Sequence, residues 1–179
     1  IGQGTAINTN ADNLQATTSA AGSVNVADTG SVNLLASVAG NFNLTAAGNV
    51  TILGALQTTN GTIATTNNGN ITQNAVIQGV GGGNATSVTL NAGGSGNVTQ
   101  TAGAVATASL NLISGSGTIG TGATPFATNA ATLSANTTGN VNVNDNLGAA
   151  VSLLASSGNS FKLVTAAALN INGALTVGS

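Results

Sequence analysis

The sequence predicts an all-β protein folded as a β-solenoid. Apolar and small polar residues alternate in short segments bounded by glycine, and these segments recur at two regular spacings. The composition agrees, since the 179-residue chain is 41% hydrophobic and only 2% charged, with a net charge of −2. A disordered chain would instead combine low hydrophobicity with high net charge. We therefore expect a folded rod of stacked, nearly uncharged layers.

The alternation predicts the strands. It is clearest in Gly22-Ser-Val-Asn-Val26, Gly30-Ser-Val-Asn-Leu34, Gly40-Asn-Phe-Asn-Leu44, Gly48-Asn-Val-Thr-Ile52 and Gly139-Asn-Val-Asn-Val143. Strict alternation of apolar and polar residues is typical of a strand with one buried face. The Gly, Asn, Asp and Ser residues between the segments favour turns. No segment keeps a helical period, so we expect no helix.

Equivalent strand positions recur after about 20 residues, which is the shorter of the two periods. Such steps lead from Val24 to Phe42, Val32 to Val50, Val50 to Ile71, Val98 to Ile119, Ile119 to Val141 and Val143 to Phe161. Two or three short strands in such a period make one coil of a solenoid. One coil cannot bury its inward face alone, so the coils must stack. The chain length then corresponds to about nine coils.

The predicted core is a column of aliphatic side chains that point inward from successive coils. Its members are Val24, Val26, Val32, Leu34, Leu44, Val50, Ile52, Ile63, Ile71, Val88, Leu90, Val98, Leu110, Leu112, Ile119, Leu133, Val141, Val143, Val151, Leu153, Leu163 and Ile171. Each such side chain contributes about 1.5–3 kcal/mol when buried. In-register stacking would place like charges about 5 Å apart, which explains why charged residues are so rare. Pro125 is expected at a turn or a strand edge.

The sequence also contains a longer repeat of about 119 residues, which includes several of the short periods. Leu34-Leu-Ala-Ser37 returns as Leu153-Leu-Ala-Ser156, and residues 22–28 return as residues 139–145. Even Ile1-Gly-x-Gly4 is similar to Ile119-Gly-x-Gly122. We expect one continuous domain over residues 1–179, with one copy in 1–118 and part of a second in 119–179. From the ratio of the two periods, one long repeat should make about six coils.

The titratable side chains are too few for most chemistry. The chain has no His or Cys, and its charged residues are Asp12, Asp28, Asp145 and Lys162. Catalysis usually needs a tuned acid, base or nucleophile, transition metals prefer imidazole or thiolate, and nucleic-acid binding needs several Lys or Arg. No apolar run approaches the roughly 18 residues of a membrane span. We therefore expect no enzyme, no cofactor, no metal, no nucleic-acid partner and no membrane span, and we assign no catalytic or binding residue.

Three features resemble sites, and each has a structural interpretation that we favour. Asp28 and Asp145 close equivalent strands, and one carboxylate is too few for calcium, so each is expected to form a turn. Lys162 alternates with two inward residues and should point into solvent. The glycine-rich residues 79–84 lack the Asp of a calcium-binding β-roll and the Lys-Ser/Thr of a phosphate loop, which favours a plain loop between coils. Residues 1–4 show no signal-peptide pattern, and we interpret the chain as part of something longer.

The repeat style resembles a known family. The segments Asn67-Asn-Gly-Asn-Ile-Thr-Gln73, Gly115-Ser-Gly-Thr-Ile-Gly-Thr121 and residues 129–143 are similar to the repeat region of filamentous-haemagglutinin-like bacterial surface proteins. This resemblance covers nearly the whole chain. It implies a right-handed parallel β-helix, export through the outer membrane, commonly by two-partner secretion, and a role in adhesion or cell-surface structure outside the cell.

Two classes of function follow. The favoured one is a structural or adhesive fibre, whose partners are copies of itself end to end, further repeats of the same chain, or cell-surface and glycan targets. The alternative is an ice-binding solenoid or a carbohydrate-binding β-helix. Ice binding needs a flat threonine array in every coil, and Thr99-Gln-Thr101 and Thr86-Ser-Val-Thr89 do not recur at one coil position. A carbohydrate-active β-helix needs Asp, Lys, Arg or His clustered on one face.

Overall fold

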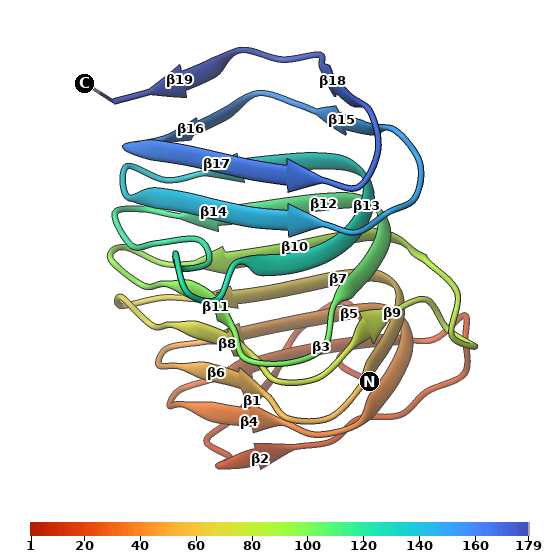
Figure 1. The fold of residues 1–179 in the computed structure, drawn as a ribbon. Coiled ribbons are helices and arrows are strands. Elements are labelled where there is room, and N and C mark those ends of the chain that lie inside the picture. The colour runs from red at the N-terminus through yellow and green to blue at the C-terminus, as the bar shows by residue number, and fades with distance from the viewer. Residues whose placement is uncertain (179) are drawn as a thin grey trace.

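The computed structural model describes residues 1–178 as a stack of parallel strands with no helix among them (Figure 1). One outward column of register pairs runs through every coil from the first to the last. It consists of Asn8, Ala27, Thr45, Ala64, Asn91, Ile113, Asn136, Ser157 and Thr176. The predicted all-β solenoid of about nine coils is therefore confirmed.

The strands form two faces of the rod. One face is a ladder of β1 (Ile7–Thr9), β3 (Ser23–Asp28), β5 (Ser37–Ala46), β7 (Leu56–Thr65), β10 (Ala85–Ala92), β12 (Val105–Ser114) and β13 (Phe126–Asn136). The other contains β2 (Asn13–Leu14), β4 (Val32–Leu34), β6 (Val50–Ile52), β8 (Ile71–Gln73) and β11 (Val98–Gln100). The rest are β9 (Ile77–Gln78), β14 (Asn140–Asp145), β15 (Val151–Leu153), β16 (Ser156–Gly158), β17 (Ser160–Thr165), β18 (Leu169–Ile171) and β19 (Leu175–Val177).

The core lies along the axis of the rod, as the sequence predicts. Every predicted inward residue from Val24 to Leu153 is buried, Leu163 is half-buried, and Ile171 is 59% exposed. Ile171 is exposed because it lies on the last coil, which no further coil covers here. The predicted column omitted several other core residues, namely Phe42, Leu56, Ile77, Val105 and Phe126. Pro125 directly precedes β13, as a residue without a ladder donor should.

The predicted short steps are confirmed except for one. Val143 pairs with Leu163, and Phe161 pairs with Val141, so the predicted step from Val143 to Phe161 is wrong by two positions. A shift of two positions leaves every side chain on the same face of the strand. Alternation alone therefore cannot detect such a shift.

One coil is longer than the others because it carries the glycine-rich loop. This coil leads from Ile71 to its partner Val98, and residues 79–84 connect β9 to β10 in between. Gly81 and Gly82 have φ values of +83° and +94°, which only glycine adopts readily. The expected plain loop is confirmed.

The long repeat recurs contact by contact. The backbone nitrogen of Asn25 donates to the carbonyl of Ile1, as that of Asn142 does to the carbonyl of Ile119. The Ala16 nitrogen donates to the Ser37 hydroxyl at 3.1 Å, and the equivalent pair in the second copy is also 3.1 Å apart. The two copies thus share their local structure.

The two copies nevertheless lie on different faces. The column that contains Val24 continues through Phe42, Gly61, Val88, Leu110, Leu133 and Leu153. Val141, the equivalent of Val24, instead lies in the opposite column above Val98 and Ile119, and β14 and β17 continue the side of β11 (Figure 1). One long repeat therefore spans about five and a half coils. This is slightly fewer than the expected value of about six, because the middle coils are longer than the short period predicts.

Candidate functional site

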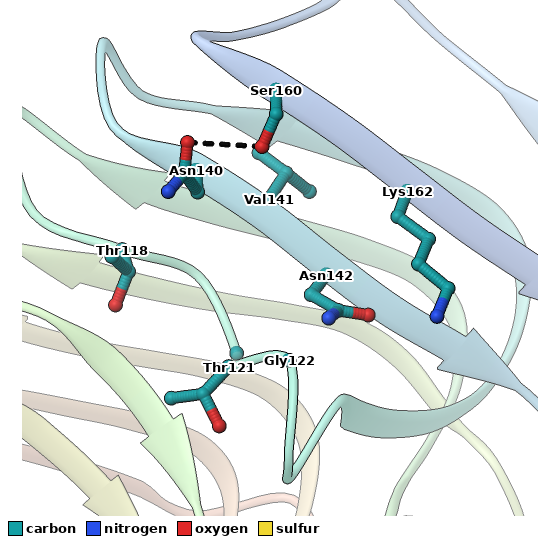
Figure 2. Close-up of a pocket in the computed structure, with 9 residues that line it drawn as sticks. Thr118, Thr121, Gly122, Asn140, Val141, Asn142, Ser160 and Lys162 are labelled. Carbon is teal, nitrogen blue, oxygen red and sulfur yellow. Dashed lines mark hydrogen bonds between the residues drawn. The ribbon is translucent and has the colours of Figure 1, made fainter.

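A hollow in the surface lies where one face of the rod loses a strand. At this layer only Ile119 bridges to Val98 below and Val141 above. The chain then leaves the face in a turn closed by a hydrogen bond from the Thr121 nitrogen to the Thr124 carbonyl. The hollow has a volume of about 360 Å³ and is lined by Thr118, Gly120, Thr121, Gly122, Asn140, Val141, Asn142, Ser160 and Lys162 (Figure 2).

Gly120 lines the hollow at a place where the backbone of the next coil leaves no room for a side chain. Its φ is +64°, and a Cβ there would lie 2.1 Å from the carbonyl oxygen of Asn142. Glycine is the only residue that fits this conformation and this close approach. The first copy shows the same requirement, because Gly2 has a φ of +63° and a Cβ would lie 2.3 Å from the carbonyl oxygen of Asn25.

Below the hollow, polar side chains on this face bond from coil to coil. Asn49 Oδ1 accepts from the Asn70 nitrogen at 2.8 Å, and Asn70 Oδ1 accepts from the Asn97 nitrogen at 2.8 Å. Asn97 Oδ1 in turn accepts from the Thr118 nitrogen at 2.7 Å and the Thr118 hydroxyl at 3.1 Å. This asparagine ladder ends at Thr118, on the edge of the hollow.

A neighbouring outward column is broken at the hollow. Asn33, Thr51, Thr72 and Thr99 stack in register, and the hydroxyls of Thr72 and Thr99 are 3.4 Å apart. The next layer has Gly120 in place of a polar side chain. Above it, the buried Oδ1 of Asn142 has no hydrogen-bond partner.

Lys162 lies directly above Asn142 in the register of β14 and β17. It is exposed, as predicted, and it is the only Lys or Arg of the chain. Figure 2 shows the amide oxygen of Asn142 turned toward the ammonium nitrogen of Lys162. None of the three Asp residues lines the hollow, so its charge is positive.

Asp28 and Asp145 lie elsewhere and form turns, as predicted. Asp28 Oδ1 accepts from the Gly30 nitrogen, and Asp145 Oδ1 accepts from the Leu147 nitrogen, both at 2.8 Å. Each Oδ2 accepts a backbone N–H from the preceding coil, from Ala11 in one case and Ala130 in the other. The two carboxylates therefore tie a turn to the coil before it.

The two carboxyl groups differ in pKa. Burial acts to raise the pKa of Asp28, but hydrogen bonds from Ala11, the Thr9 hydroxyl and Gly30 outweigh it and lower the pKa. Burial outweighs the two backbone hydrogen bonds of Asp145 and raises its pKa. The pKa values differ for two reasons: Asp145 is more deeply buried than Asp28, and Thr128, the equivalent of Thr9, donates instead to the Val105 carbonyl of the coil beneath.

Residues 1–178 contain no group of three or more His, Cys, Asp or Glu that could hold a metal ion. In the same residues, no helix is long and apolar enough to cross a membrane. Sequence reasoning missed the hollow. The available signal was the Ile-Gly-x-Gly motif, which interrupts the alternation, together with a lysine where the first copy has Asn43.

Comparison with known proteins adds no relative. Neither a protein-family model, nor a curated protein sequence, nor a solved structure matches this chain. Its function is accordingly inferred from the contacts described above.

Proposed function

We propose that this chain is a structural and adhesive repeat segment of a large secreted bacterial surface protein of the filamentous-haemagglutinin type. In this proposal its coils form or extend a fibre outside the cell by end-to-end stacking. The observation that supports it most is that the last coil is built like an internal one. Residues 160–177 repeat residues 41–58, and inside the rod Leu44 is covered by Ile63 and Leu56 by Ile77.

On the last coil the corresponding side chains are open to solvent. Leu175, Val177 and Ile171 are 40%, 50% and 59% exposed. Removing apolar surface from water contributes about 25 cal/mol per Å², and an open strand edge is a template for further pairing. A further coil, from the same chain or from a second copy, would therefore be stabilised on this end.

The first coil presents the opposite end in the same way. Ile7 is 44% exposed, whereas its equivalent Phe126 is completely buried in the second copy. The difference arises because β12 lies beneath β13, while residues 1–178 place no coil beneath β1. Both ends thus show surfaces that are covered when they occur inside the rod. The near absence of charge also removes like-charge repulsion between stacked coils.

The fibre proposal is tested by electron microscopy and sedimentation velocity on the chain and two double variants. The wild-type chain should form unbranched filaments with a repeat of about 4.8 Å along the axis. Ile171→Lys with Leu175→Lys should give monomers, because both changes place charge on the open inward face. Asn170→Lys with Thr176→Lys changes outward positions of the same coil and should still assemble.

Two outcomes would contradict the proposal. One is a wild-type chain that stays monomeric at every concentration. The other is assembly that both double variants weaken equally, since added charge alone would then account for the effect.

One observation favours a second candidate, ice binding. Thr51, Thr72 and Thr99 stack on three successive coils, although the Thr-x-Thr motif itself does not recur there, since Leu53 and Asn74 stand where the later coil has Thr101. The column changes to Asn33 below and meets Gly120 above, which limits the array to three coils. Thermal hysteresis that Thr72→Lys abolishes would support this candidate over the fibre.

A further inference from the structure

We propose that the hollow around Gly120, Asn142 and Lys162 binds the carboxylate of a small sugar acid. The proposal does not depend on end-to-end stacking, because the lining side chains point outward from the side of the rod. It rests on the polar groups that line the hollow and on its positive charge.

Two nitrogen donors can meet an anion in the hollow. The ammonium group of Lys162 lines it, and the amide nitrogen of Asn142 faces Gly122, where an added Cβ would lie 4.0 Å away. The buried amide oxygen of Asn142 is turned toward Lys162 (Figure 2). The amide nitrogen, at the other end of the group, therefore faces the hollow. A carboxylate that accepts from both nitrogens would form charge-assisted hydrogen bonds, which are the strong ones.

The rim of the hollow carries polar groups that can form hydrogen bonds with the hydroxyl groups of a ligand. Thr118, Thr121 and Ser160 contribute hydroxyls, and the side-chain oxygen of Asn140 already accepts from Ser160 at 2.9 Å. The hollow is about 360 Å³, at the lower end of the roughly 300–1,000 Å³ typical of small-molecule sites. The size and the rim together indicate a hydroxylated ring that carries one carboxylate, such as a uronic acid.

The internal repeat provides a comparison within the same chain. In the first copy Asn43 pairs with Asn25, in the register where the second copy pairs Lys162 with Asn142. Both strand pairs are parallel and pair their equivalent residues in the same register. The lysine therefore adds a cation at one of two equivalent places, beside an amide whose oxygen has no partner.

The test is a titration of the full chain with glucuronate, and in parallel with glucose, which has a similar ring without the carboxylate. Backbone amide NMR signals of residues 118–122, 140–142 and 160–162 should shift with glucuronate. Glucose should bind at least about tenfold more weakly, as expected when a charge-assisted hydrogen bond is lost. Lys162→Asn, which installs the residue of the first copy, should weaken glucuronate binding by about tenfold or more with an unchanged circular dichroism spectrum.

Asn43→Lys is the matched control, because it adds the same charge at the equivalent place of the first copy. It should leave the affinity at the hollow unchanged and create no second site of equal strength. A further titration with polyglucuronate distinguishes two sources of the ligand. Equal affinity per sugar residue indicates that the free acid is the ligand. Tighter binding of the polymer indicates an acidic polysaccharide. Both results support the site.

Three results would overturn the proposal. Glucose could bind as well as glucuronate, Lys162→Asn could leave the affinity unchanged, or the shifts could fall outside the residues that line the hollow.

Discussion

Asn70 Oδ1 accepts two hydrogen bonds from Asn97 in the next coil, from the backbone nitrogen at 2.8 Å and from Nδ2 at 3.0 Å. A single side-chain oxygen thus joins both the backbone and the side chain of its neighbour. Such a contact is possible because polar residues occupy the same place in successive layers. It shows how a chain with almost no charge can hold its coils in register.

The contribution of the asparagine ladder to the stability of the fold should be measurable. Asn70→Ala removes the acceptor for both Asn97 donors and the Nδ2 contact to Asn49. With about 0.5–1.5 kcal/mol for each of these three net hydrogen bonds, we expect a loss of about 1.5–4.5 kcal/mol in the free energy of unfolding. Denaturant unfolding measures it, and Thr66→Ala at an exposed position of the neighbouring turn should change little. Equal effects of the two changes would contradict the role of the ladder.

The stability of the turn beside the hollow should depend on Gly120 having no side chain. Gly120→Ala brings a Cβ against the Asn142 carbonyl at a φ of +64°, and strain of this kind costs about 1–3 kcal/mol. Gly83→Ala is the control, since a Cβ there meets nothing within 4 Å and the φ of Gly83 is not positive. The midpoint of thermal unfolding should fall for the first variant and stay nearly constant for the second. A tolerated Gly120→Ala would show that the loop can move away.

The two buried carboxylates should respond to pH in opposite directions. The pKa of Asp28 is lowered in the folded state, so its stabilising effect is present above the unfolded value of 3.8 and is lost as the pH falls through the folded pKa. The pKa of Asp145 is raised, so its stabilising effect is present below 3.8 and is lost as the pH rises through the folded pKa.

These signs predict the behaviour of two variants. Between about pH 3 and pH 7, the stability cost of Asp28→Asn should grow, whereas the cost of Asp145→Asn should shrink. Urea unfolding at a series of pH values measures both costs. Parallel trends for the two variants would show that the Thr9 hydroxyl does not distinguish the two sites.

Much of the fold could be predicted because the solenoid repeats one simple rule. Alternation places Val24 and Val50 inside and the asparagines between them outside, and the short period follows from the recurrence of such strands. The buried threonines and glutamines could not be found in this way. Gln100 can be buried because its side chain makes two hydrogen bonds to the backbone of Ala127 in the next coil. Its Nε2 donates to the Ala127 carbonyl, and its Oε1 accepts from the Ala127 nitrogen. The sequence does not reveal that these two residues meet.

The hollow was beyond sequence reasoning for a related reason. Gly120 and Lys162 are far apart in the chain, and each has an ordinary structural interpretation when taken alone. Only the stacking of the coils brings Gly120, Asn142 and Lys162 together, each from one of three successive layers. The unpartnered amide oxygen is a property of three layers together.

The sequence by itself determined that the chain is all-β, that its coils stack in about nine layers, and that small uncharged residues fill equivalent places. These results follow because side-chain alternation and repetition are local properties, readable without knowing what lies above or below. The tertiary structure decided how far each coil extends, and so turned the second copy by about half a turn relative to the first. It did so because the length of a loop such as residues 79–84 changes the length of a coil without changing the strands that flank it.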